Sequence, residues 1–161
     1  MNQTIFITGA SSGLGKASAK LFASKGWTVI ATMRQPENET ELTQLPNIHL
    51  LKLDISNAGQ IAEVAAQAEK ISPVDVVCNN AAYGLMRAFE GTTAEQMAQQ
   101  INTNFLGTLL VTKSFLPYFR AIKSGTILTV TSSTANIPYP FVAVVCGNKI
   151  SLGNVDGRHK L

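Results

Sequence analysis

Five short runs of apolar and β-branched residues recur along the chain, and longer stretches with helical spacing separate them. The runs cover residues 4–8, 27–33, 48–53, 74–78 and 126–131. Because each run is almost continuously apolar, both faces of each strand are expected to be covered. That arrangement is typical of an α/β protein, in which helices pack on both faces of a parallel sheet. We therefore predict a doubly wound parallel sheet of about five strands in the order 3-2-1-4-5.

Three longer segments carry the apolar spacing of amphipathic helices. They cover residues 12–24, 57–70 and 92–119, and the polar stretch 35–44 is expected to hold at most a short helix. Ser56 or Asn57 is placed to cap the second helix, and Thr92 or Thr93 opens the third as part of a capping box. Pro117 allows a bend near the end of this third helix, which is otherwise predicted to be continuous.

The pattern weakens after Lys149. Gly153, Asn154 and Gly157 interrupt any helix there, so residues 151–161 are expected to form an irregular tail after one domain over residues 1–150. A six-stranded doubly wound sheet needs at least one more strand-helix unit, so the sheet is predicted to be incomplete on its C-terminal side.

Composition excludes several classes of protein. Charged residues make up 14% and hydrophobic residues 45% of the 161 residues, which excludes intrinsic disorder. No window of about 20 residues is continuously apolar and no signal peptide is recognisable, so we expect a cytoplasmic protein without a membrane span. The net charge of +3 is spread thinly and gives no support for a nucleic-acid partner. No His, Cys or carboxylate stands at metal-ligand spacing, so no metal site is expected.

The turn between the first strand and the first helix is rich in glycine. Residues 8–15 read Thr-Gly-Ala-Ser-Ser-Gly-Leu-Gly. Glycines let a pyrophosphate approach the amide groups at the helix N-terminus, where the helix dipole adds about half a positive charge. The spacing G-x-x-x-G-x-G differs from the plain fingerprint G-x-G-x-x-G, and a glycine-rich turn without a ligand is the alternative interpretation. The turn favours a Rossmann-type, NAD(P)-binding domain over residues 1–150, and its candidate coenzyme-binding residues are Gly9, Ser11, Ser12, Gly13, Leu14 and Gly15.

The chain resembles the short-chain dehydrogenase/reductase family, whose TGxxxGxG turn matches residues 8–15. Further motifs of this family follow in the family's order. Leu53-Asp54-Ile55 resembles the segment that contacts the adenine ring. Asn79-Asn80-Ala81-Ala82 is similar to the family's NNAG, with Ala82 in place of glycine, and Asn104-Phe105-Leu106-Gly107 resembles its N-x-x-G. The resemblance covers residues 4–149 and implies that the coenzyme is also held by Asp54, Ile55, Asn80, Ala81 and Lys149.

The choice of dinucleotide depends on the end of the second strand. Folds of this kind that bind NAD carry an acid there, whereas an arginine nearby accommodates the 2′-phosphate of NADP. Here the position is Met33, the next residue is Arg34, and the nearest acids are Glu37 and Glu39. Ser12 and Arg34 are both placed to contact a phosphate, although a solvated loop charge is the alternative for Arg34. NADP(H) is therefore favoured over NAD(H).

The resemblance also implies a catalytic set. In the family a tyrosine donates a proton, a lysine lowers the pKa of that tyrosine and holds the ribose, a serine binds the substrate oxygen, and an asparagine orders a proton-relay water. The corresponding positions here are Val145, Lys149, Ser132 and Asn104. Valine has no proton to give, and general acid catalysis supplies roughly 10²–10⁴ in rate. Tyr139 lies between two prolines, which makes it a loop residue rather than a substitute acid.

Three hypotheses about function follow. The resemblance implies an NADP(H)-dependent oxidoreductase acting on a carbonyl or a secondary alcohol, with activity impaired by Val145 and by the absence of the family's C-terminal third. The second hypothesis is a non-catalytic nucleotide-binding domain that is able to hold NADP(H) or to pair with a complete homologue, in a homo- or hetero-oligomer. The third is a remnant of a truncated or frame-shifted gene that has no function of its own.

Overall fold

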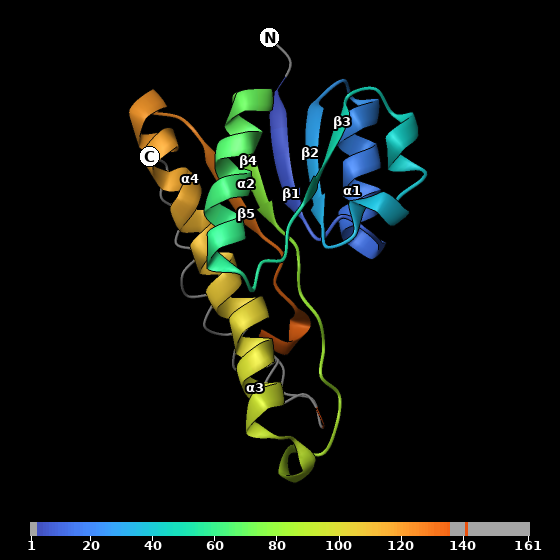
Figure 1. The fold of residues 1–161 in the computed structure, drawn as a ribbon, viewed down its shortest axis with the longest axis vertical. Helices are drawn as coiled ribbons and strands as arrows, with labels where there is room; N and C mark the ends of the chain where they lie inside the picture. Colours follow the sequence, from blue (N-terminus) through green and yellow to red (C-terminus); the bar gives the residue numbers. More distant parts are fainter. Residues whose placement is uncertain (1–2, 136–140, 142–161) are drawn as a thin grey trace.

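The computed structural model describes residues 3–135 and 141. A five-stranded parallel sheet has the predicted order β3-β2-β1-β4-β5 (Figure 1). Its strands are β1 (Thr4–Thr8), β2 (Thr28–Met33), β3 (Ile48–Lys52), β4 (Val76–Asn79) and β5 (Thr126–Thr129). The helices are α1 (Gly13–Ser24), α2 (Ala58–Ile71), α3 (Ala94–Ile101) and α4 (Thr108–Ile122). Since all strand pairs are parallel, the carboxyl ends of the strands share one edge, which is the lower edge of the sheet in Figure 1.

Alternate residues of the central strands face two different helix layers. Phe6 and Ile30 belong to one buried cluster together with side chains of α2 and α4, which lie side by side in Figure 1. Ile7 and Ala31 belong to a second buried cluster that includes Ala19 of α1. Every residue of β1 is buried because this strand is covered on both faces. The doubly wound α/β prediction is confirmed.

The long third helix of the prediction is interrupted. It begins as expected after Thr93, which forms a capping box with Gln96. A π-helical segment, Asn102–Gly107, then joins α3 to α4. Gly107 lies against the carbonyl oxygen of Ile55, which a Cβ at this position would overlap. The wider π-helical turn coincides with this tertiary contact, and helical periodicity in the sequence does not encode such a contact. The prediction of an uninterrupted α-helix is therefore wrong over these six residues.

The remaining connections agree with the sequence patterns. The polar stretch after β2 holds two single 3₁₀ turns, Pro36–Asn38 and Leu42–Gln44. Asn57 caps α2, and its Oδ1 accepts from the Gln60 amide at 3.1 Å. Within residues 3–135, no helix is long and apolar enough to cross a membrane, and no group of three His, Cys, Asp or Glu side chains is arranged for a metal ion.

Candidate functional site

A cavity of about 410 Å³ lies at the carboxyl edge of the sheet, beside the N-terminus of α1. It gathers the following residues that the sequence predicts for coenzyme binding: Gly9, Ser11, Ser12, Leu14, Gly15, Arg34, Asp54, Ile55, Asn80 and Ala81. Gly13 belongs to the same turn but is not among the lining residues. Segments far apart in the sequence meet here because the strands that precede them are neighbours in the sheet and end at the same edge.

The glycine turn packs directly on the segment that follows β4. Gly9 has φ +68°, and a Cβ at this position would lie 2.7 Å from the Cα of Ala81. A Cβ at Gly15 would overlap both the side-chain amide of Asn80 and the carbonyl oxygen of Gly9. These two glycines are therefore required by close packing within the protein, a role that the sequence analysis did not assign to them.

Hydrogen bonds of Asn80 stabilise the same contact between the glycine turn and the segment after β4. Its Nδ2 donates to the carbonyl oxygens of Thr8, at 2.9 Å, and Gly9, at 3.0 Å. The Thr8 hydroxyl oxygen accepts from the backbone amides of Asn80 and Ala81, each at 3.0 Å. Asn80 lines the cavity, but its side-chain amide holds the shape of the turn. The contribution of Thr8 was missed because its partners lie 72 and 73 residues away in the sequence.

The N-terminus of α1 lacks the side-chain caps found at the N-termini of α2 and α3. The hydroxyl of its N-cap, Ser12, makes no capping hydrogen bond, and no acid stands in the first turn. By contrast, Asn57 caps α2 and Thr93 caps α3. The first-turn amides of α1 and the positive end of its dipole thus lie at the cavity without a side-chain acceptor. Such an end is suited to binding an anion.

Asp54 and Arg34 lie on the side of the cavity formed by the ends of β3 and β2. The Asp54 carboxylate accepts from the Ser56 hydroxyl at 2.7 Å and the Ser56 amide at 2.9 Å. These two hydrogen bonds, aided by the positive charge of Arg34, lower the pKa of Asp54. Arg34 is exposed, and it also lines an adjoining hollow of about 190 Å³ together with Ser11, Met33, Gln35, Asn38 and Glu39.

Asn104 is buried in the π-helical segment and holds the loop after β4. Its Nδ2 donates to the carbonyl oxygen of Tyr83 at 2.8 Å, and its Oδ1 accepts from the Tyr83 amide at 3.0 Å. Buried Gln100 also donates to the Tyr83 carbonyl oxygen, at 3.1 Å. Sequence reasoning missed Tyr83 and Gln100, since no local pattern marks a glutamine or a loop tyrosine as partners.

Ser132 lies after β5 and is half-buried. Its Oγ accepts from the Thr134 amide at 3.2 Å. It is not among the residues that line the cavity. Tyr139, Val145, Lys149 and the predicted tail 151–161 lie outside the described residues. Of the predicted catalytic set, Asn104 and Ser132 are therefore the members whose surroundings are described.

The model of a protein family described as short chain dehydrogenase matches residues 3–153. The chain belongs to the short-chain dehydrogenase family. A 3-ketodihydrosphingosine reductase of Bacteroides thetaiotaomicron is 34% identical over 140 residues, which is 85% of this chain and 50% of that protein. The chain thus spans about half the length of the curated relatives it matches.

Solved structures agree with the family assignment. A short-chain dehydrogenase from Streptomyces avermitilis superposes with a TM-score of 0.91 at 28% identity, over 96% of this chain and 58% of that one. ElxO, solved with NADP bound, superposes with a TM-score of 0.89 at 27% identity, over 96% of this chain and 65% of that one. The sheet and helices described above are therefore those of the short-chain dehydrogenase fold.

Proposed function

We propose that this chain binds NADP(H) in the cavity at the carboxyl edge of the sheet. In this proposal residues 1–150 form the nucleotide-binding domain of an oxidoreductase that acts on a carbonyl or a secondary alcohol. The observation that carries it is the α1 N-terminus, which has no side-chain cap at the cavity where Arg34 also stands. Membership of the short-chain dehydrogenase family, and the NADP bound in the ElxO structure, support the same coenzyme class.

The glycine turn fits a pyrophosphate. Gly13 has φ +53°, and apart from its chain neighbours and its own helix no described atom lies within 4 Å of the place where its Cβ would be. A phosphate oxygen is therefore free to approach this backbone and accept from the first-turn amides of α1, whose dipole favours negative charge. The cavity volume of about 410 Å³ also falls within the range of roughly 300–1,000 Å³ that is usual for small-molecule sites.

The side of the cavity near β2 fits the adenosine end of NADP(H). Arg34 places a positive charge in the adjoining hollow, where Ser11 adds a hydroxyl. A carboxylate at the end of β2 would bind the ribose hydroxyls and favour NAD. Met33 stands at this position and offers none. Asp54 and Ile55 line the same side of the cavity and are proposed to contact the adenine ring.

When bound, NADPH supplies a hydride to a carbonyl carbon. We assign the Ser132 hydroxyl to hold the substrate oxygen, the Lys149 ammonium to hold the ribose, and Asn104 to fix the loop that carries Tyr83. Val145 stands where the family has its proton-donating tyrosine and has no proton to give. We therefore expect coenzyme binding with severely impaired reduction, and a non-catalytic NADP(H)-binding domain is the second candidate function.

The test is a thermal melt of the purified chain with saturating NADPH, with saturating NADH, and without ligand. A ligand at 100 times its dissociation constant stabilises a folded protein by about 2.7 kcal/mol. NADPH is expected to raise the melting temperature, and to do so more than NADH. A cooperative melt that neither coenzyme shifts would refute the proposal.

A further inference from the structure

A buried carboxylate stands in the wall of the hollow that holds Arg34. The side chain of Glu39 is 5% exposed, and its Oε1 accepts from the amides of Glu41, at 2.8 Å, and Leu42, at 3.0 Å. Burial alone would raise the pKa of Glu39, but the Leu42 amide and the Lys16 ammonium outweigh it, so the pKa is lowered. Glu39 thus carries a negative charge at neutral pH, and it lines the same hollow as Arg34.

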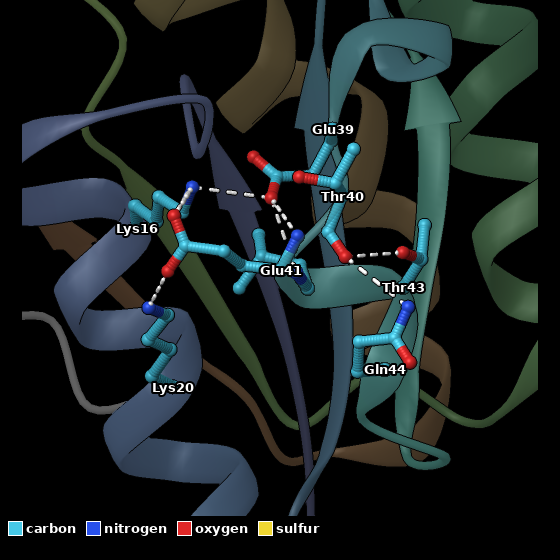
Figure 2. Close-up of polar contacts among 8 residues, drawn as sticks. Lys16, Lys20, Glu39, Thr40, Glu41, Thr43 and Gln44 are labelled. Carbon is cyan, nitrogen blue, oxygen red and sulfur yellow. Dashed lines mark hydrogen bonds and ion pairs between the residues drawn. The ribbon is translucent and has the colours of Figure 1, made fainter.

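Lys16 of α1 provides the counter-charge to this carboxylate. Its Nζ lies 3.1 Å from Glu39 Oε1 and 2.7 Å from Glu41 Oε1 (Figure 2). Lys20, one turn further along α1, pairs with the other carboxylate oxygen of Glu41 and has no contact with Glu39 in Figure 2. Both lysines of α1 form ion pairs with the loop after β2, but only Lys16 pairs with Glu39, the carboxylate in the wall of the hollow.

The charge in this hollow matters because NADPH and NADH differ there. The 2′-phosphate that distinguishes NADPH is an anion, and an uncompensated carboxylate in the same wall would repel it. NADH carries a neutral hydroxyl at that position. A change in the charge of Glu39 or Lys16 should therefore affect the two coenzymes unequally.

We propose that Lys16 determines coenzyme preference indirectly: it neutralises Glu39 and so lets the hollow beside Arg34 accept the 2′-phosphate. The inference rests on the proposed function, since it assumes that the adenosine end lies at Arg34. Lys16 is a positioning and charge-compensating residue in this account, and it makes no contact with the phosphate itself.

The experiment measures dissociation constants of NADPH and NADH by calorimetric titration for Lys16→Met, Glu39→Gln and the double variant. Lys16→Met is expected to weaken NADPH binding about 5- to 10-fold, as one uncompensated charge in a partly solvated wall would do, while NADH binding changes less than about 2-fold. Glu39→Gln keeps an acceptor for the two amides and removes the charge, so NADPH binding should be unchanged or tighter. The double variant should regain the wild-type ratio of the two constants.

Lys20→Met is the matched control, because Lys20 pairs with Glu41 and should leave the ratio unchanged. If Lys16→Met still costs NADPH affinity in the Glu39→Gln background, Lys16 contacts the phosphate directly and the inference is wrong. It is also wrong if Lys16→Met leaves the ratio unchanged, or if Glu39→Gln weakens NADPH selectively. If Lys16→Met does not fold, the Glu39→Gln result decides.

Two outcomes separate this inference from the proposed function. A wild-type chain that binds neither coenzyme would refute the proposed function as well. A wild-type preference for NADPH that survives Lys16→Met would refute this inference alone.

Discussion

The side-chain amide of Asn104 pairs with both backbone polar groups of Tyr83: it donates to the carbonyl oxygen at 2.8 Å and accepts from the amide at 3.0 Å. Asn104 is 1% exposed, so water cannot replace these bonds freely. The pairing attaches the loop after β4 to the π-helical segment, and it brings Tyr83 to the cavity wall. The residue that the family resemblance marks as a proton-relay group therefore also has a structural task.

Replacing Asn104 with Ala should destabilise the fold. The Tyr83 amide would lose its side-chain acceptor and the Tyr83 carbonyl oxygen would keep only Gln100 as a donor, which costs about 1–3 kcal/mol. Urea unfolding followed by circular dichroism measures the change. Gln99→Ala, one turn away on an exposed side chain, should change the free energy of unfolding by less than about 0.5 kcal/mol. Equal values for the two variants would contradict the structural role of the Asn104–Tyr83 pair.

Substitutions at Gly9 and Gly26 distinguish two destabilising effects of adding a side chain, which are backbone strain at positive φ and steric overlap of the Cβ. Both have positive φ, +68° and +81°, but a Cβ at Gly9 meets Ala81 whereas described atoms leave the space at Gly26 open. Gly26→Ala should therefore cost only the strain of its backbone, about 1–2 kcal/mol. Gly9→Ala should cost a further ~1–3 kcal/mol from overpacking. Chemical denaturation of both variants tests this order, and a smaller loss for Gly9→Ala would show that the turn moves away from Ala81 easily.

Replacing Arg34 with Met should weaken NADPH binding more than NADH binding. Loss of a charge-assisted hydrogen bond to the 2′-phosphate corresponds to roughly 10- to 100-fold in the dissociation constant. Calorimetric titration with both coenzymes gives the ratio. Arg87→Met is the control, because Arg87 donates to Gln96 at 2.7 Å and does not line the cavity. An equal loss for the two coenzymes would remove the argument for NADP(H).

Acid should weaken the contact between α1 and the loop after β2. Hydrogen bonds from Lys16 and Lys20 lower the pKa of Glu41 from 4.5 to about 2. Because the pKa is lower in the folded state, the stabilisation by these pairs is complete above pH 4.5 and is lost as the pH falls toward 2. Glu41→Gln should therefore flatten the decline of stability over this interval, as measured by thermal melts at several pH values. A Glu63→Gln variant, at an exposed position on α2, serves as the comparison, and an identical decline in wild type and Glu41→Gln would contradict the prediction.

Local patterns were sufficient to predict the sheet and the order of its strands. The apolar runs define buried strands, and the cap at Asn57 and the capping box at Thr93 define helix starts, since each of these signals is contained in a few neighbouring residues. Parallel strands joined by helices leave few possible topologies, so the order of β1 to β5 followed. Ten of the residues predicted for the coenzyme line the cavity at one edge of the sheet as a consequence of that order.

The tertiary structure decided which of those residues touch each other. Asn80 is bound to the backbone of Thr8 and Gly9, Asn104 is bound to Tyr83, and Glu39 is neutralised by Lys16 from a helix more than twenty residues earlier. The family resemblance implied a coenzyme-binding role for Asn80 and a proton-relay role for Asn104, and the sequence marked Glu39 only as an acid near the end of the second strand. A side chain's partner depends on where distant backbone groups lie after packing, and hydrophobic periodicity carries no record of those distances. Patterns of neighbouring residues thus determined the fold, whereas the packed structure determined which polar groups pair around the cavity and the adjoining hollow.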